Sequence, residues 1–276
     1  MKQCILTISL ALALTAQQRI IVIGHAYTDI VDRLGMMPNV VAISNGAKSI
    51  KSATGKYSLG SFRNLSLESI LALNPDLLIL PEGSGPQHVI DQLKKVTDLT
   101  VKLMPTITTL DQLHGQIGEL AAILQKSNEA NRLITILKQQ ESELKAAVAK
   151  ISSRQKSMFI YARGTAMIFV AGYDTQADLT MRLAGLDNVV TEFDGFKPLT
   201  AESILQSDPE YVLMLKSGAQ SLGDTNSIFD QPGLKLSKAA KNKRLLLVDD
   251  DCFLSIGPQT LSEAGRIMRQ VYAEIQ

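Results

Sequence analysis

Short apolar runs alternate along this chain with segments of helical spacing. Residues 19–24 form a continuous apolar run that ends in glycine, which predicts a buried strand, then a loop at residues 25–28 and a helix at residues 29–34. A stretch rich in Ser, Gly and Lys at residues 44–60 predicts a long loop. Further strands are predicted at residues 40–43, 77–80, 101–104, 158–161, 168–170, 211–215 and 244–248, and further helices at residues 87–93, 110–124, 176–183 and 261–275. Strands that alternate with helices indicate an α/β fold with mostly parallel sheets covered on both faces.

One pattern occurs twice, at residues 63–80 and 197–214. Each copy has a hydroxyl residue suited to cap a helix, Ser66 or Thr200, followed by a first-turn acid, Glu68 or Glu202. A short apolar helix then runs to a residue before proline, and a compact apolar strand follows. A helix-turn-strand unit repeated more than a hundred residues apart predicts two similar lobes around a cleft.

The segment at residues 128–151 contains no Gly or Pro and has apolar positions near helical spacing. It predicts one long helix of about 24 residues, about 35 Å in length. The expected organisation is a first lobe at residues 19–126, a linking helix at residues 127–152 and a second lobe at residues 153–276. The fold class is therefore two Rossmann-like lobes with a ligand cleft between them.

The N-terminus has the pattern of a secretory signal peptide at residues 1–16, with one positive charge, a short apolar core and small residues before a polar start. We expect removal near Ala16 and export to the periplasm; the alternative is a buried first element. Cys252 is then the one cysteine left, so no intramolecular disulfide is expected. The net charge of +1 gives no electrostatic case for a nucleic-acid partner.

In open α/β sheets, ligands bind beyond the carboxyl ends of the strands. This places residues 25–28, 57–62 and 82–86 on one rim. The first strand does not lead into a Gly-x-Gly-x-x-Gly loop, and the chain has no Gly-x-Ser-x-Gly elbow, Walker loop or close metal-ligand spacing. A secreted α/β enzyme is the alternative from another class, and we expect a binding protein with no catalytic step.

Several motifs carry a family resemblance across the whole mature chain. They are Leu-Ser-Leu-Glu-Ser-Ile-Leu at residues 65–71, Ala-Gly-Tyr-Asp-Thr-Gln-Ala-Asp at residues 171–178, Arg-Leu-Ala-Gly-Leu-Asp-Asn at residues 182–188, Gly-Phe-Lys-Pro-Leu-Thr-Ala-Glu at residues 195–202 and Ile-Gly-Pro at residues 256–258. The chain resembles the substrate-binding proteins of metal-chelate ABC importers, and among them the periplasmic haem-binding proteins. The resemblance implies a monomer that binds haem (hemin) and delivers it to an ABC permease dimer. A ferric siderophore or cobalamin is the alternative cargo.

Haem-binding relatives usually have an axial tyrosine in a Leu-Gly-Tyr-x-Arg context, but here residues 59–63 read Leu-Gly-Ser-Phe-Arg, with Ser61 at the tyrosine position. A serine hydroxyl is a poor primary ligand for haem iron, whereas tyrosinate and imidazole are good ones. The candidate axial ligands are therefore, in order, His25, Tyr57, Tyr27, Tyr173 and Tyr161. The alternative for each is a rim residue that packs or caps.

The remaining expected ligand contacts include Arg63, which retains the family's arginine and suits a propionate carboxylate. The others are Ser61, Phe62, Lys56, Arg163 and Lys197, each with a solvated or packing role as the alternative. The resemblance implies that Glu68 and Glu202 meet arginines of the permease. The alternative is that both are first-turn acids stabilised by the helix dipole.

Overall fold

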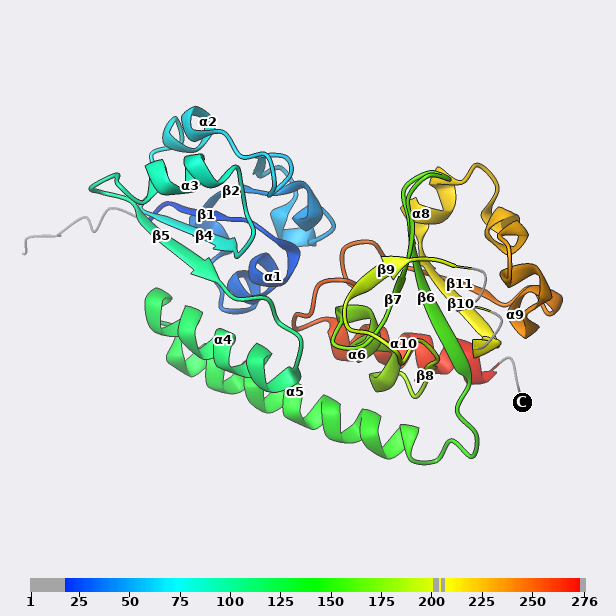
Figure 1. The fold of residues 1–276 in the computed structure, drawn as a ribbon. Coiled ribbons are helices and arrows are strands. Elements are labelled where there is room, and N and C mark those ends of the chain that lie inside the picture. Colours follow the sequence, from blue (N-terminus) through cyan, green and yellow to red (C-terminus); the bar gives the residue numbers. More distant parts are fainter. Residues whose placement is uncertain (1–17, 201–203, 205–206, 274–276) are drawn as a thin grey trace, which may run out of the picture.

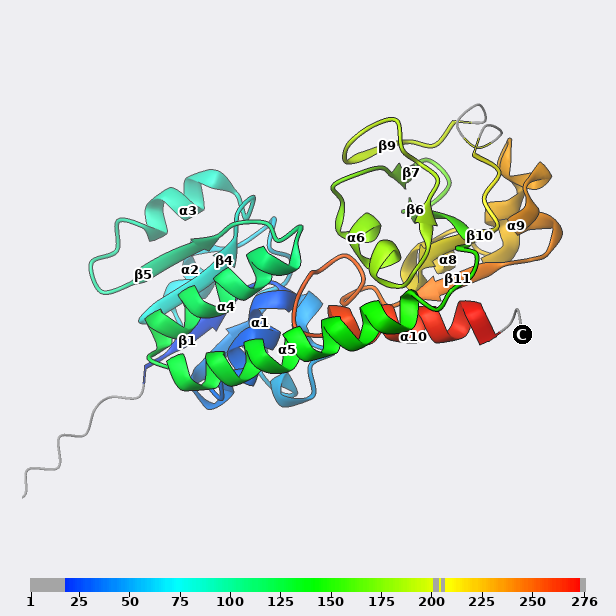
Figure 2. The same ribbon diagram turned by 90° about the horizontal axis from the view of Figure 1, so that it is seen from below.

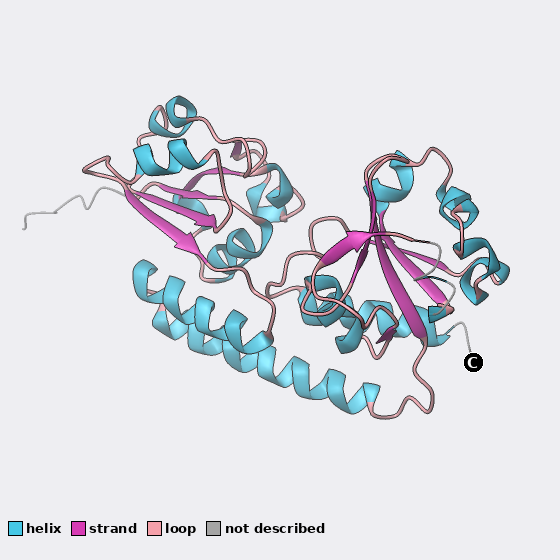
Figure 3. Ribbon diagram, in the orientation of Figure 1, coloured by secondary structure: helices cyan, strands magenta, loops and turns pink. Residues whose placement is uncertain are grey.

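The computed structural model describes residues 18–200, Ile204 and residues 207–273. It has two α/β lobes side by side, with one long helix passing beneath both (Figures 1 and 2). Helices flank the sheet of each lobe (Figure 3), as the alternation of apolar runs and helical segments predicts. No helix among the described residues is long and apolar enough to cross a membrane.

The first lobe contains a parallel sheet in the order β3-β2-β1-β4-β5. Successive residues of β1 face opposite sides of the sheet. Ile20 packs into the core cluster that contains Ile30 of α1, whereas Ile21 packs with Ile70 of α2 on the other face. The elements of this lobe are β1 (Ile20–Val22), α1 (His25–Arg33), β2 (Val40–Ile43), β3 (Tyr57–Ser58), α2 (Leu67–Leu71), β4 (Leu77–Pro81), α3 (Gln87–Leu93), β5 (Thr100–Met104) and α4 (Leu110–Leu124).

Two local predictions for this lobe were wrong. Helix α1 begins at His25, not at residue 29, because Gly24 adopts φ of 96° and turns the chain directly from strand to helix. The Thr28 hydroxyl donates to the Gly24 carbonyl at 2.8 Å, which closes the first turn. The expected loop at residues 44–60 contains two 3-10 turns, Asn45–Ala47 and Lys51–Ala53, and the short edge strand β3.

The second lobe contains the sheet β11-β10-β6-β7-β9, with β8 paired to β6. Its β7 and β9 run antiparallel to their neighbours, so this lobe departs from the parallel plan of the first. Phe159 on β6 is fully buried in its core. The elements are β6 (Lys156–Ala162), β7 (Ile168–Ala171), α6 (Gln176–Leu183), β8 (Asp187–Asn188), β9 (Phe196–Pro198), β10 (Tyr211–Leu215), α8 (Lys216–Ser221), α9 (Lys238–Lys241), β11 (Leu245–Val248) and α10 (Thr260–Ala273).

The long helix is α5 (Ser127–Val148), which packs antiparallel against α4 and continues beneath the second lobe (Figures 1 and 2). Leu133, Leu137, Leu144 and Val148 of α5 are all buried in one core cluster that contains residues of both lobes. These are the apolar positions that predicted the helix. Gly185, after α6, lies against Val148, so the second lobe closes onto the end of α5.

Structure supports the internal duplication beyond the repeated motif. Asp29 and Arg33 form an i,i+4 ion pair at 2.9 Å in α1, and Asp178 and Arg182 form the same pair at 3.0 Å in α6. In the first copy of the motif, the Ser66 hydroxyl accepts from the Ser69 amide at 3.3 Å, as an N-cap does. The helix of the second copy lies largely outside the described residues, and its strand is β10.

Candidate functional site

A cavity of about 890 Å³ lies between the lobes, within the usual size range of ligand pockets of about 300–1,000 Å³. The first lobe contributes the segments that follow β1, β2 and β4, as expected for the carboxyl ends of parallel strands. The second lobe contributes the β6–β7 hairpin, β9 and the segment after β11. The two carboxyl-terminal sheet edges therefore face one another across one site.

The first-lobe wall is mostly polar. The Ser44 hydroxyl accepts from the Gly24 amide at 2.9 Å, and the Asn45 side chain accepts from the Ser58 hydroxyl at 2.7 Å. Arg63 is exposed, and its guanidinium lies 4.8 Å from the centre of the Phe62 ring. This wall therefore offers hydrogen-bonding groups and one cation without a carboxylate partner in any described ion pair.

The second-lobe wall is aromatic. Phe196 of β9 lies edge-to-face with Tyr161 at 6.4 Å and with Phe159 at the same distance. Phe169 lines the same wall, and Met167 at the hairpin tip is exposed toward it. Phe196 and Met167 remain 39% and 49% exposed, so an apolar ligand has uncovered surface to bury here. The part of the second-lobe wall formed by β6, β7 and β9 is thus apolar, whereas Arg163, Asp250 and Asp251 add charged groups to the same side of the cavity.

His25 is the best placed of the expected ligands. It lies in the first turn of α1, is only 6% exposed and lines the cavity. Its Nδ1 lies 3.0 Å from the Gly46 carbonyl oxygen, which only accepts, so Nδ1 carries the proton in the neutral ring. The Nε2 atom is then the acceptor, and Cys252 Sγ lies 3.7 Å from it. This is the tautomer of a metal-binding imidazole held by a carbonyl.

Tyr27 also lines the cavity, but its hydroxyl donates to the Pro105 carbonyl at 2.6 Å. Burial raises the pKa of this phenol well above its ordinary value, and the charges of Glu82 and Glu119 raise it further. Forming the tyrosinate that binds ferric iron would break the bond to Pro105 and place a charge in a buried position. This geometry suits an anchor of α1 better than a ligand.

The other tyrosines are placed differently. Tyr161 lines the cavity, and its hydroxyl accepts from Arg163 Nε at 3.1 Å. Tyr57 on edge strand β3 is 57% exposed and is not among the residues that line the cavity. Tyr173 is 42% exposed and also lies outside the lining. An axial role for Tyr57 or Tyr173 would require the chain to rearrange.

Two arginines lie on opposite walls of the cleft. Arg63 comes from the first lobe, and Arg163 comes from the β6–β7 hairpin of the second. The Arg163 guanidinium stacks over Tyr161 at 5.2 Å and donates through NH1 to the Ser217 hydroxyl at 2.5 Å. Lys56 and Lys197 lie outside the lining, and Lys197 stacks over Phe193 at 4.5 Å. The structure therefore brings two of the four expected cations to the cavity, together with Ser61 and Phe62.

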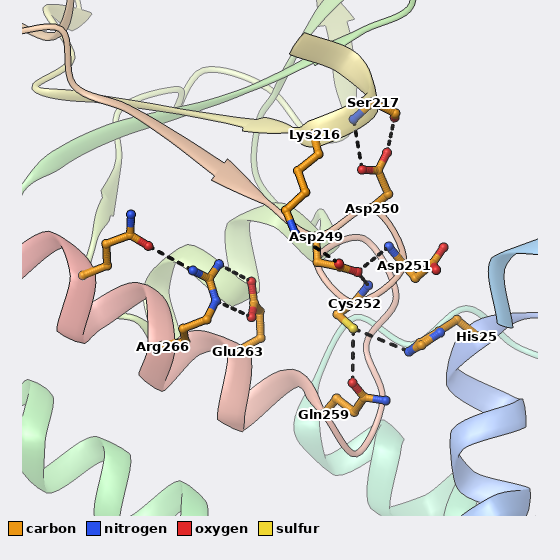
Figure 4. A network of polar contacts seen from close by, with 11 residues as sticks. His25, Lys216, Ser217, Asp249, Asp250, Asp251, Cys252, Gln259, Glu263 and Arg266 are labelled. Atoms are coloured by element: carbon orange, nitrogen blue, oxygen red, sulfur yellow. Dashed lines mark hydrogen bonds and ion pairs between the residues drawn. The ribbon is translucent and has the colours of Figure 1, made fainter. Parts of the chain in front are cut away.

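The segment between β11 and α10, residues 249–259, was not among the predicted contacts and forms part of the cavity wall. We call it the junction loop. Asp250 accepts from the Ser217 amide at 3.1 Å within its own lobe, whereas Cys252 Sγ lies 3.7 Å from His25 Nε2 of the other lobe (Figure 4). Burial raises the pKa of Asp251, while a hydrogen bond from Ser49 and the charge of His25 lower it. The run of three aspartates was the available signal in the sequence.

Glu68, one of the two predicted docking acids, does not line the cavity. Glu68 is exposed in the first turn of α2, on the surface of the first lobe. Glu202 and the predicted signal peptide at residues 1–16 lie outside the described residues. Within the described part of the chain, no group of three or more His, Cys, Asp or Glu side chains is arranged to hold a metal ion.

Two lobes, a spanning helix and a cleft at the sheet edges are the architecture of a binding protein. The chain matches the periplasmic binding protein family over residues 20–252 and belongs to that family.

Among solved structures, it is similar to the periplasmic heme-binding protein RhuT from Roseiflexus sp. RS-1 in apo form, with a TM-score of 0.87 and 28% identity, covering 94% of this chain and 100% of that one. It is equally similar in fold to the periplasmic heme-binding protein BhuT in complex with two hemes, with a TM-score of 0.87 and 25% identity, covering 94% and 99% of the two chains. In sequence, it is 26% identical over 258 residues to the vitamin B12-binding protein of Pectobacterium atrosepticum, which covers 92% of this chain and 88% of that protein.

Proposed function

We propose that this protein captures haem in the cleft between its lobes and delivers it to the permease of an ABC importer. The observation that carries the proposal is that the cleft has an aromatic surface on the second lobe and a polar surface on the first. An aromatic wall of Tyr161, Phe169 and Phe196 faces a polar wall that carries Arg63. A porphyrin has an apolar face and carboxylates at one edge, so it complements both. Similarity to periplasmic heme-binding proteins supports the same cargo.

His25 is the proposed axial ligand. Its Nε2 is the acceptor atom of a ring fixed through Nδ1 by the Gly46 carbonyl, and this arrangement raises the basicity of a metal-binding imidazole. Arg63 and Arg163 would hold the two propionates from opposite walls, because a guanidinium matches a carboxylate in shape and charge. This assignment replaces the tyrosine that Ser61 cannot supply.

Titration of the apoprotein with haemin tests the proposal. We expect a saturable Soret band whose position and visible bands are those of histidine ligation, and His25→Ala is expected to change the spectrum. His88→Ala is the matched control, because His88 is exposed on α3 outside the cavity. Absence of a Soret band at saturating haemin would refute haem as the cargo.

Cobalamin is the second candidate, because relatives named vitamin B12-binding proteins match nearly the whole chain. The same cleft volume and the same imidazole suit a corrinoid cobalt. Calorimetric titration with hydroxocobalamin, alongside titration with haemin, distinguishes the two candidate cargoes. Binding of the corrinoid without a haem Soret band would identify cobalamin, not haem, as the cargo.

Glu68 and Glu202 are proposed as a docking pair, one on each lobe, for basic residues of a permease dimer. The exposure of Glu68 and the repetition of its sequence context support this role. Replacing both with lysine is expected to abolish uptake and leave haem binding unchanged; unaltered uptake would refute the role. Export with removal of residues 1–16 is tested by the mass of the protein recovered from the periplasm.

A further inference from the structure

The junction loop of the second lobe contacts the first turn of α1 in the first lobe at three places. The Ala26 amide donates to the Ser255 hydroxyl at 3.1 Å. Gly257 packs so closely that a Cβ there would lie 3.1 Å from Ala26 Cα. The third contact joins Cys252 Sγ to His25 Nε2 at 3.7 Å (Figure 4). Only this third contact uses an atom for which a metal would compete.

The protonation of the pair follows from its neighbours. Because the Gly46 carbonyl fixes the proton of His25 on Nδ1, Nε2 needs a donor, and among the described residues its hydrogen-bond partner is the Cys252 thiol. That thiol has one proton and a closer acceptor, Gln259 Oε1 at 3.2 Å. A thiol with its ordinary pKa of about 8.5 is protonated at neutral pH, so Sγ has one proton to donate. His25 Nε2 therefore has one weak donor that it shares.

We propose that the Cys252 thiol competes for the Nε2 atom of His25 and is displaced when the iron of an incoming haem takes the Nε2 lone pair. This inference rests on the function proposed above. The thiol proton stays on sulfur and is donated to Gln259 instead, no bond to sulfur forms, and no electron is transferred. The thiol is thus a competitor that sets the affinity of the cleft for metal chelates.

Loading would also move the cavity wall. A metal–imidazole bond is about 2 Å long, so iron does not fit between two atoms 3.7 Å apart. Cys252 must retreat from Nε2, and the junction loop carries Asp251, Leu254 and Ser255 of the cavity lining with it. Haem binding would then be coupled to the junction loop, which ties the second lobe to α1.

Three variants test the inference through haemin titration of the mature chain. In Cys252→Ala the competing donor is gone, so we expect haem to bind between about twofold and tenfold more tightly, the range given by one ordinary hydrogen bond. Cys252→Ser replaces the thiol with a hydroxyl, which is a stronger donor, and is expected to bind haem more weakly than the alanine variant. Gln259→Leu removes the alternative acceptor, leaves the thiol proton to His25, and is expected to weaken binding. Gln259 does not line the cavity, so this variant does not remove a ligand contact.

The S–H stretching band provides a direct readout, since Cys252 is the one cysteine after residue 16. We expect haemin to shift this band, and His25→Ala to shift it in the absence of haemin. Three results would overturn the inference while haem binding itself stands. They are an unchanged haem affinity in Cys252→Ala, a change of haem affinity in the same direction in Cys252→Ala and Gln259→Leu, and haem absorption bands of the thiolate-ligated type. A wild-type chain with no Soret band would overturn the proposed function and this inference together.

Discussion

Phe159 connects the core of the second lobe to two parts of the cleft. The ring is fully buried on β6, contacts Phe253 of the junction loop at 4.8 Å and meets Phe196 of the aromatic wall at 6.4 Å. Truncating a buried phenylalanine lowers the free energy of unfolding by about 3–5 kcal/mol. Each aromatic pair contributes about 0.5–1.5 kcal/mol beyond area burial. We therefore expect Phe159→Ala to lose about 4–5 kcal/mol of unfolding free energy, in the upper half of the range for buried phenylalanines.

Equilibrium urea unfolding measures this loss. At an m value of about 2 kcal/mol/M, the midpoint for the second lobe should fall by about 2 M without a change in m. Tyr57→Ala is the matched control: Tyr57 is 57% exposed on edge strand β3, so its removal should change the free energy of unfolding by no more than about 0.5 kcal/mol. A Phe159→Ala midpoint within about 0.5 M of the wild type would refute the assignment of this ring as the centre of the core.

Three further predictions concern single positions. Burial, and then the charge of Asp249, raise the pKa of Cys252 from 9.0 to about 12. Iodoacetamide at pH 8 should therefore alkylate the folded chain at least about a hundredfold more slowly than the urea-unfolded chain. Equal alkylation rates would contradict the raised pKa. A raised pKa in the folded state also means that stability present below pH 9 is lost as the pH rises toward 12, so Cys252→Ser should flatten the fall in urea midpoint over that range.

Gly185→Ala adds a Cβ 2.6 Å from Ile151 Cδ1 at φ of 75°, whereas Gly35→Ala, at the duplicated position and the same φ, meets open space. Thermal melting should show a loss of unfolding free energy of about 1–2 kcal/mol for Gly35→Ala and about 1–3 kcal/mol more for Gly185→Ala. Equal losses would argue against the packing of Gly185 on α5. Ser66→Ala removes the cap of α2 and should lower the free energy of unfolding by about 0.5–2 kcal/mol without altering haem affinity, which urea unfolding and titration measure together.

Strands with a continuous apolar run could be predicted, because such a run identifies a strand without any neighbour. The run at residues 77–80 became β4, and the run at residues 211–215 became β10. Two edge strands lack this signal: β3 has only Tyr57 and Ser58, and β9 includes Pro198. The start of α1 was missed because His25 follows a glycine and no side chain caps the helix.

The rim of the cleft could also be predicted, because it follows from strand ends. The direction in which each rim residue points could not. Tyr57 begins strand β3 and His25 follows strand β1. Tyr57 is nevertheless 57% exposed outside the cavity, whereas His25 is 6% exposed within the cavity lining. The contact between His25 and Cys252 joins positions 227 residues apart, so it depends on how the lobes meet, which local patterns do not encode.

The difference between the two walls follows from the difference between the two sheets. In the first lobe every strand is parallel, so the cleft receives loop segments such as Ser44 and Arg63 that follow strand ends and remain polar. In the second lobe the antiparallel β7 and β9 run along the cleft and present side chains of strand residues, Phe169 and Phe196. A duplicated fold has thereby acquired unlike walls, and under the proposed function a planar chelate would lie with its apolar face on β7 and β9.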